Sequence, residues 1–199
     1  MENKINGVVR SQGRAQLVDL FGYSSKGLPG IEVVGIGNLG RALKEKFVYL
    51  SRQQHLKLPP RRYVLCVENR EGLVDKDNFG PLEFPLLLLF WALAGQLPVA
   101  RLDDCIAHGK VMLAYRVWME RFSEDEVLAL TAQVKKFSGP GPKWIVPRKD
   151  MGEWDRMGTT ALPAEDILGA WPQWVFMGLE KQGATATELG SQSHQVLGK

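Results

Sequence analysis

Residues 27 to 62 have the sequence GLPGIEVVGIGNLGRALKEKFVYLSRQQHLKLPPRR, and this stretch decides the fold of the chain. Ile31 to Ile36 is an apolar run with a single charge, which is typical of a β-strand. From Leu39 to about Gln54 apolar residues recur at helical spacing, and Tyr63 to Val67 is a second strand-like run. The stretch therefore predicts a strand–helix–strand unit with a glycine-rich turn before the helix.

Gly35, Gly37 and Gly40 in this turn spell G-x-G-x-x-G, the dinucleotide-binding fingerprint, in the expected strand-to-helix context. A nicotinamide site also needs an acidic residue at the end of the second strand, about 20 residues further on. The first acid at a strand end here is Glu68, 28 residues past Gly40. Two interpretations stay open: an NAD(P)-dependent oxidoreductase that uses the three glycines, or glycines that only permit a sharp turn.

The segments outside this unit predict further strands and a core helix. Ile5 to Val9 and Ala15 to Phe21 are strand-like runs joined by a polar turn, which indicates a hairpin. Pro85 to Gly95 is apolar throughout, but its eleven residues are too few for a membrane span of about 20 residues, so we expect a buried helix. The capping-box pattern of Ser123 to Glu126 predicts another helix start, and Trp144 to Val146 a further strand.

The remaining segments complete a mixed pattern. Residues 106–117 are a weaker strand or hairpin candidate, and residues 148–157 and 164–177 are expected to be helical, the second with a break at Pro172. Strands and helices alternate only in part, and the early hairpin argues against a purely doubly wound sheet. We therefore expect an α/β fold of α+β character, a mixed sheet with helices packed on it.

The composition is that of a globular protein, with 199 residues, 45% of them hydrophobic and 24% charged. We expect a domain over residues 1–160, a C-terminal helical appendage over 161–180, and a mobile tail over 181–199, which is poor in large apolar residues. Two cysteines make no disulfide framework, and residues 1–10 hold no apolar segment of secretory type, so we expect a cytoplasmic protein. The net charge of +3 neither demands nor excludes nucleic acid.

Three blocks of the sequence resemble the N-terminal domain of the magnesium-chelatase-like AAA+ family that includes the competence protein ComM. Members of that family show a G-L-P-x-x-x-I-V-G-L-P stretch, a helix with Lys and Glu, and F-P-P-x-R before a strand. A G-P-x-x-D-L-P-I-A-L block and an I-V-P stretch follow. The matching residues are Gly27–Leu28–Pro29, Val33–Val34–Gly35, Lys44–Glu45, Leu58–Pro59–Pro60–Arg61–Arg62, Gly80–Pro81–Leu82–Glu83–Phe84–Pro85–Leu86–Leu87–Leu88 and Ile145–Val146–Pro147–Arg148.

This resemblance implies a fold of the Lon-protease-domain-like, ribosomal-protein second-domain-like superfamily. It also implies a non-catalytic accessory or interaction module that engages a separate ATPase, nucleic acid or its own copies, without a cofactor. ATPase activity does not carry over, because the sequence contains no Walker A pattern G-x-x-x-x-G-K-[ST]. The chain departs from the family at Gly37 and Asn38, where relatives carry a proline and an aspartate.

Peptidase activity is the enzymatic function that the Lon-like fold suggests. Lon-type proteases use a serine in a G-P-S-A-G-like turn, activated by a lysine, because a serine hydroxyl is a poor nucleophile without a base. The matching turn here contains Leu82 and Glu83, and the expected lysine falls near Glu124. Both partners are missing, so we expect no peptidase activity.

Basic residues recur along the helix and the connection after it, interrupted by Glu45. ComM-like motors act on DNA, so the resemblance implies that this basic run contacts phosphates; the alternative is a solvated helix face. The candidate nucleic-acid contacts are Arg41, Lys44, Arg52, Lys57, Arg61 and Arg62.

Two smaller features complete the candidates. Trp171, Trp174 and Phe176 form an aromatic cluster, which either covers the domain's own core or docks a partner. Cys105 and His108 form a C-x-x-H half-site, but a structural zinc site needs four ligands. We therefore expect a core cysteine with a loop histidine, and no metal.

Overall fold

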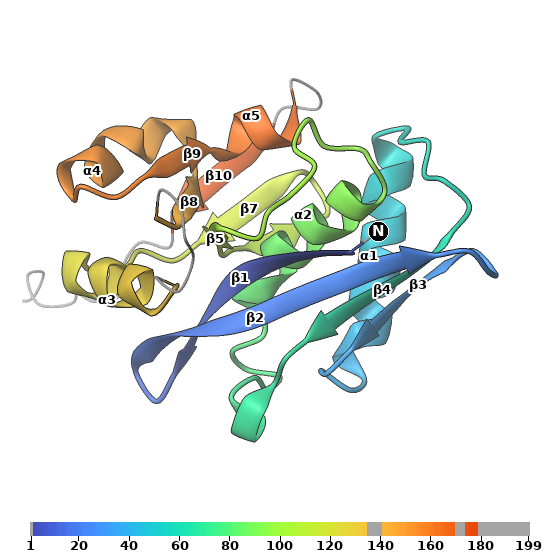
Figure 1. Cartoon of the computed structure of the whole chain (residues 1–199), viewed down its shortest axis with the longest axis horizontal. Coiled ribbons are helices and arrows are strands. Elements are labelled where there is room, and N and C mark those ends of the chain that lie inside the picture. Colours follow the sequence, from blue (N-terminus) through green and yellow to red (C-terminus); the bar gives the residue numbers. More distant parts are fainter. Residues whose placement is uncertain (1, 135–140, 170–173, 179–199) are drawn as a thin grey trace, which may run out of the picture.

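The computed structural model describes residues 2–134, 141–169 and 174–178 (Figure 1). Within these residues seven strands form one mixed sheet in the order β3-β4-β2-β1-β5-β8-β9, with helices packed on it, which confirms the expected fold class. Three more strands form a second sheet in the order β10-β7-β6. The strands are β1 (Glu2–Ser11), β2 (Arg14–Ser25), β3 (Gly30–Val34), β4 (Arg62–Val67), β5 (Cys105–Ala107), β6 (Lys110–Met112), β7 (Arg116–Met119), β8 (Lys143–Val146), β9 (Ala161–Pro163) and β10 (Val175–Gly178).

The main sheet has two halves that meet at β1. On one side β2 pairs antiparallel with β1 and with β4, and β3 lies parallel to β4 at the edge. On the other side β5, β8 and β9 continue parallel to β1. The hairpin and the strand–helix–strand unit predicted from the sequence are therefore both confirmed, with Gln12 and Gly13 at positive φ in the hairpin turn.

Helices α1 (Leu39–Gln53) and α2 (Glu83–Leu93) cover one face of the main sheet, and α2 lies behind β1 and β2 in Figure 1. Every residue of α2 is buried, as the apolar run from Pro85 predicted. The rings of Phe47 in α1 and Phe90 in α2 stack with centroids 6.1 Å apart. Among helices of the described residues, none is long and apolar enough to cross a membrane.

Helices α3 (Glu124–Val134) and α4 (Met151–Arg156) lie on the opposite face, over β1, β5 and β8. Here Val8, Ile106 and Trp144 form a second apolar cluster. The predicted capping box is present, because the Ser123 amide donates to the Glu126 carboxylate at 3.0 Å and the Glu126 amide donates to Ser123 Oγ at 3.3 Å. The 3₁₀ turns are η1 (Arg70–Gly72), η2 (Gly80–Leu82) and η3 (Arg148–Asp150).

The expectation of a helix over residues 164–177 is wrong in its second half. Helix α5 (Ala164–Leu168) ends at Gly169, whose φ of +82° terminates it. Residues 175–178 form β10, which pairs with β7 and obtains its hydrogen bonds there. The expected appendage over 161–180 therefore contributes β9 to the main sheet and β10 to the second sheet, while Pro172 and the expected tail over 181–199 lie outside the described residues.

Candidate functional site

The glycine turn between β3 and α1 is explained by close backbone packing. Gly35 has a φ of +92°, and a Cβ there would lie 2.0 Å from the carbonyl oxygen of Val67 at the end of β4. A Cβ on Gly40 would lie 2.5 Å from the carbonyl oxygen of Val33. Gly37 has a φ of +54° and open space where its side chain would be. The structure thus gives two of the three glycines a packing reason that involves no cofactor.

The positions where the family resemblance would place a protease serine hold a buried leucine and a partly buried ion pair instead. Leu82 is fully buried, and the Glu83 carboxylate accepts two hydrogen bonds from Lys46 Nζ at 2.8 and 2.9 Å. Lys46 Nζ also donates to the Val111 carbonyl at 3.0 Å, and the Val111 amide donates to Glu83 at 2.9 Å. This closed network ties α1, α2 and β6 together, and Glu124 lies exposed at the start of α3.

The basic residues proposed from the sequence are spread along α1 and the connection to β4. Arg41 and Arg52 are exposed near opposite ends of α1, and Lys57 and Arg61 are exposed in the connection. Two of the six candidates are already paired on the surface: Lys44 with Glu45 at 3.5 Å and Arg62 with Glu32 at 2.5 Å. Exposed pairs of this kind are weak and screened by salt.

The aromatic cluster proposed from the sequence covers the core where it is described. Trp174 and Phe176 are only 8% and 6% exposed. The ring of Trp174 lies 5.9 Å from Trp91, and the ring of Phe176 lies 5.9 Å from Phe84 of α2. This burial corrects the docking hypothesis for both residues, because a packed ring offers no free surface; Trp171 lies outside the described residues.

The half-site of Cys105 and His108 is not extended by other ligands in the described part of the chain. Cys105 is buried in β5, and burial raises the pKa of its thiol to about 12. Among residues 2–134, 141–169 and 174–178, no group of three His, Cys, Asp or Glu side chains is placed to hold a metal ion.

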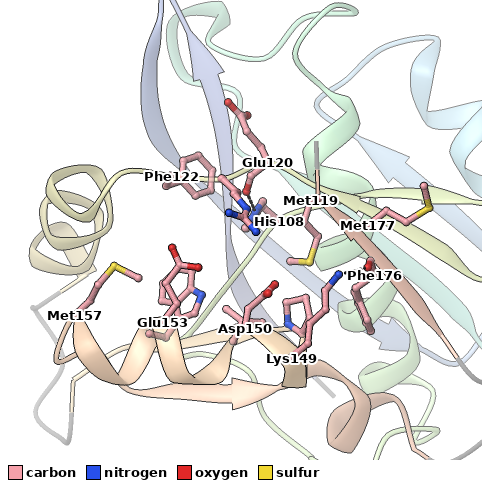
Figure 2. A pocket seen from close by; sticks show the side chains of 15 residues that line it. His108, Met119, Glu120, Phe122, Lys149, Asp150, Glu153, Met157, Phe176 and Met177 are labelled. Carbon is pink, nitrogen blue, oxygen red and sulfur yellow. Dashed lines mark hydrogen bonds between the residues drawn. The ribbon is translucent and has the colours of Figure 1, made fainter. Parts of the chain in front are cut away.

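A cavity of about 60 Å³ lies at the carboxyl ends of the parallel strands β5 and β8 (Figure 2). The order β1-β5-β8-β9 runs in one direction across this part of the sheet, and these strands are parallel. In open α/β sheets, ligands commonly bind beyond the carboxyl ends of the parallel strands. The lining comprises His108, Met119, Glu120, Arg121, Phe122, Val146, Pro147, Lys149, Asp150, Glu153, Trp154, Met157, Phe176, Met177 and Gly178.

His108 is the buried polar group of this cavity. Its Nε2 lies 2.8 Å from the carbonyl oxygen of Glu120, which can only accept, so Nε2 carries the proton. Burial lowers the pKa of His108 to about 4, so the ring is neutral near pH 7 and Nδ1 is a lone-pair acceptor. Nδ1 is buried and has no hydrogen-bond partner among the described residues.

This histidine makes stability depend on pH. Its pKa in the folded state, about 4, lies below its ordinary value of 6.5, so the unfolded chain binds the extra proton between these values. We expect the free energy of unfolding to fall as the pH is lowered from 6.5 to 4, by up to roughly 3 kcal/mol. Urea unfolding at several pH values measures this loss.

The control for this prediction is His108→Gln, which keeps a side-chain N–H donor but does not titrate. The variant should show a flatter pH dependence between 6.5 and 4 than the wild type. Carboxyls with lowered pKa, such as Glu126 beside Arg10, also lose their stabilisation on acidification, but equally in both proteins. Identical slopes in the two proteins would contradict the neutral, buried state of His108.

The second sheet presents an exposed apolar face that the sequence interpretation missed. Its strands alternate in burial, so Val111, Val117 and Phe176 point inward. Cross-strand pairing aligns two rows on the other side, Met112–Arg116–Val175 and Lys110–Trp118–Met177. Met112, Trp118 and Val175 are 40%, 36% and 50% exposed, and Leu113 beside them is 54% exposed.

We call this surface the three-strand face: Lys110, Met112, Arg116, Trp118, Val175 and Met177. Its two charges are both positive, and no ion pair is recorded for Lys110 or Arg116 among the described residues. Alternation at residues 110–118 is the available sequence signal, but the sequence pattern predicts a helix over the residues that form β10. Each of the two rows takes its third residue from β10, so a prediction that lacks this strand does not predict the face.

No protein-family model matches this chain, and no curated protein sequence matches it.

Proposed function

We propose that this chain is a non-catalytic interaction module of the ComM N-terminal type, and that it binds a separate protein, an AAA+ ATPase, through the three-strand face. The observation that carries the proposal is an apolar surface with Trp118 at its centre, which burial within the described fold does not explain. Exposed apolar patches of this kind mark interaction sites, and Trp, Met and Arg are enriched in them.

The charges of this face favour a partner with acidic residues around an apolar patch. Lys110 and Arg116 flank Trp118 and Met112, and the six positions of the face include no carboxylate. Trp118 is the single aromatic ring among the six residues of the face, whereas Met112, Val175 and Met177 pack against apolar protein side chains and give nucleic-acid bases no ring to stack on. A protein partner therefore accounts for more of the surface than a nucleic acid does.

The arrangement at the turn before α2 supports a non-catalytic role. A buried leucine and a carboxylate locked to Lys46 occupy the positions of a Lon-type serine, and neither can attack a carbonyl carbon there. Binding of a protein partner is then the function that the exposed residues can perform. We expect Trp118 to contribute the most binding free energy of any residue in this interface.

The test is capture of the ATPase by variants of the full chain. Trp118→Ala should weaken binding about 30-fold or more, because a central tryptophan contributes roughly 2 kcal/mol or more to an interface. Its own stability should change by about 1 kcal/mol or less, since the side chain is partly exposed. Pull-down with quantification of the retained AAA+ protein, and urea unfolding, measure the two effects.

Phe21→Ala is the matched control, because Phe21 is an aromatic residue of β2 in the main sheet and is 44% exposed. It should leave ATPase capture unchanged. Loss of capture with Phe21→Ala but not with Trp118→Ala would move the interface to the main sheet. Capture of nucleic acid instead of an ATPase, lost on replacing Arg41 and Arg52, would favour the basic stretch of α1 and overturn the proposal.

A further inference from the structure

Strand β3 is one open edge of the main sheet, at the end opposite to β9 (Figure 1). Its Gly30 amide donates to the Arg61 carbonyl at 3.1 Å, which fixes the direction of the later backbone groups in the strand. Because N–H and C=O groups alternate in direction along a strand, those of Ile31 and Val33 point away from β4, toward the open edge. Unpaired edge groups of this kind are a template for a further strand.

We propose that a second copy of this chain supplies that strand: the two β3 edges pair antiparallel across a two-fold axis at Ile31, and one sheet then runs through both copies. This contact is separate from the three-strand face that the proposed function uses. A two-fold contact is self-complementary, so each feature of the edge must fit the same edge turned around. The backbone groups, the charges and the apolar side chains of β3 meet this condition in one common register.

The backbone groups of the edge match in this register. At the axis, Ile31 of each copy donates its N–H to the Ile31 carbonyl of the other, which gives two hydrogen bonds. Two residues along the strand, the Val33 N–H faces the carbonyl of Pro29 of the second copy. Pro29 has no N–H to return, and the Val33 carbonyl is already covered by Gly40 of α1, where a Cβ would lie 2.5 Å away.

Opposite charges meet in the same register. A hollow of about 420 Å³ at the start of β3 is lined by Lys26, Arg62 and Glu32 among others, and it lies beside Gly30, whose Cβ position is open. Glu32 of the second copy is opposite Gly30, so its carboxylate enters the hollow beside Lys26 and Arg62. Within one chain Arg62 already donates to Glu32 at 2.5 Å, and a guanidinium has enough donors for a second carboxylate.

The most exposed large hydrophobic side chain among the described residues is covered in this arrangement. Leu28 is 90% exposed and lies just before β3. The register places it beside Val34 of the second copy, which is 37% exposed. A foreign peptide could satisfy the backbone of the edge, but it would give no reason for these pairings within one sequence. A second copy therefore accounts for more of the edge.

The first experiment is sedimentation velocity of the full chain from about 30 to 600 µM, because a contact of one strand should give a weak dimer, with a dissociation constant on the order of 100 µM. The mass should rise from 22.2 kDa toward twice this value. The Ile31 and Val33 amides should exchange with water about threefold more slowly at the higher concentration, whereas the Glu32 amide, which faces β4, should not change. A chain that stays monomeric over this range overturns the proposal.

Cysteine replacements test the register. Ile31→Cys should form a disulfide between two copies on mild oxidation, because opposite residues of a hydrogen-bonded pair have Cα atoms about 5.5 Å apart, within disulfide range. Val33→Cys should not, since the residue opposite it in this register is Pro29. Both changes are made in a chain with Cys66→Ser, which removes the half-buried native thiol. Equal cross-linking of the two variants would contradict the pairing.

Leu28→Lys should weaken the dimer about five- to tenfold, because the lost contact occurs twice and the new charge lies near Lys26. Leu128→Lys, the same change at a 45% exposed leucine of α3, is the matched control and should leave the dimer unchanged. Equal weakening by both variants would refute the contact. A dimer that Trp118→Ala abolishes and Leu28→Lys leaves intact would place the contact on the three-strand face, and it would refute the β3 pairing as well.

Discussion

Replacing Lys46 with methionine is expected to lower the free energy of unfolding by about 3 kcal/mol. Methionine keeps the apolar stem, but it leaves the Glu83 carboxylate, whose side chain is 9% exposed, without its counter-ion. Removing the partner of a nearly buried charge costs more than the pair contributes, because the remaining charge has lost both water and partner. Urea unfolding measures the loss, and a melting temperature lower by roughly 6–12 °C should accompany it.

Two further variants isolate the cause. Lys44→Met removes a lysine two residues away whose partner, Glu45, is exposed, and it should cost less than about 0.5 kcal/mol. The double change Lys46→Met with Glu83→Gln should recover at least about 1 kcal/mol of the loss, because a neutral amide still accepts from the Val111 amide. If Lys46→Met and Lys44→Met proved equally mild, the network would not hold α1 and α2 together.

Gly35→Ala is expected to cost about 3 to 5 kcal/mol, among the largest effects of any single change in this chain. The added Cβ would lie 2.0 Å from a carbonyl oxygen of β4, and the φ of +92° is unfavourable for any residue with a side chain. The colliding atom is the backbone oxygen of Val67, which pairs with Leu20 of β2, so it cannot rotate away. Denaturant unfolding of the purified variant, or its failure to accumulate as folded protein, gives the result.

Gly37→Ala is the matched control, and it also separates the two interpretations of the glycine pattern. Its φ is +54° with open space at the Cβ, so it should cost only about 1 kcal/mol. In a dinucleotide site the second glycine allows the pyrophosphate to approach, so there Gly37→Ala would abolish cofactor binding. We expect no thermal shift of the wild type with NAD(H) or NADP(H); a clear shift that Gly37→Ala removes would establish the oxidoreductase alternative.

Local patterns were sufficient where a segment's own residues decide its structure. The alternation and turn between Ile5 and Phe21 gave the hairpin, and the spacing from Leu39 gave α1. The uninterrupted apolar run after Pro85 gave α2 and its full burial. Such segments are long enough for periodicity to distinguish helix from strand.

Patterns failed for the short strands of the second sheet. Val175 to Gly178 contains four residues, and nothing within them favours a strand over the end of a helix. Pairing with β7 decides the outcome, since it provides hydrogen bonds from residues almost 60 positions earlier in the chain. The docking hypothesis for Trp174 and Phe176 was wrong for the same reason. These two rings pack on Trp91 and Phe84 and are buried, whereas Trp118 is exposed on the second sheet.

The sequence by itself determined the α/β class, the hairpin, the β3–α1–β4 unit and the core helix, because each depends on the period and polarity of consecutive residues. Only the tertiary structure decided the pairing of Lys46 with Glu83, the three-strand face and the unpartnered nitrogen of His108. These features join residues separated by tens of positions, and which partners meet depends on the crossing of strands and the packing of helices, information that no local window contains.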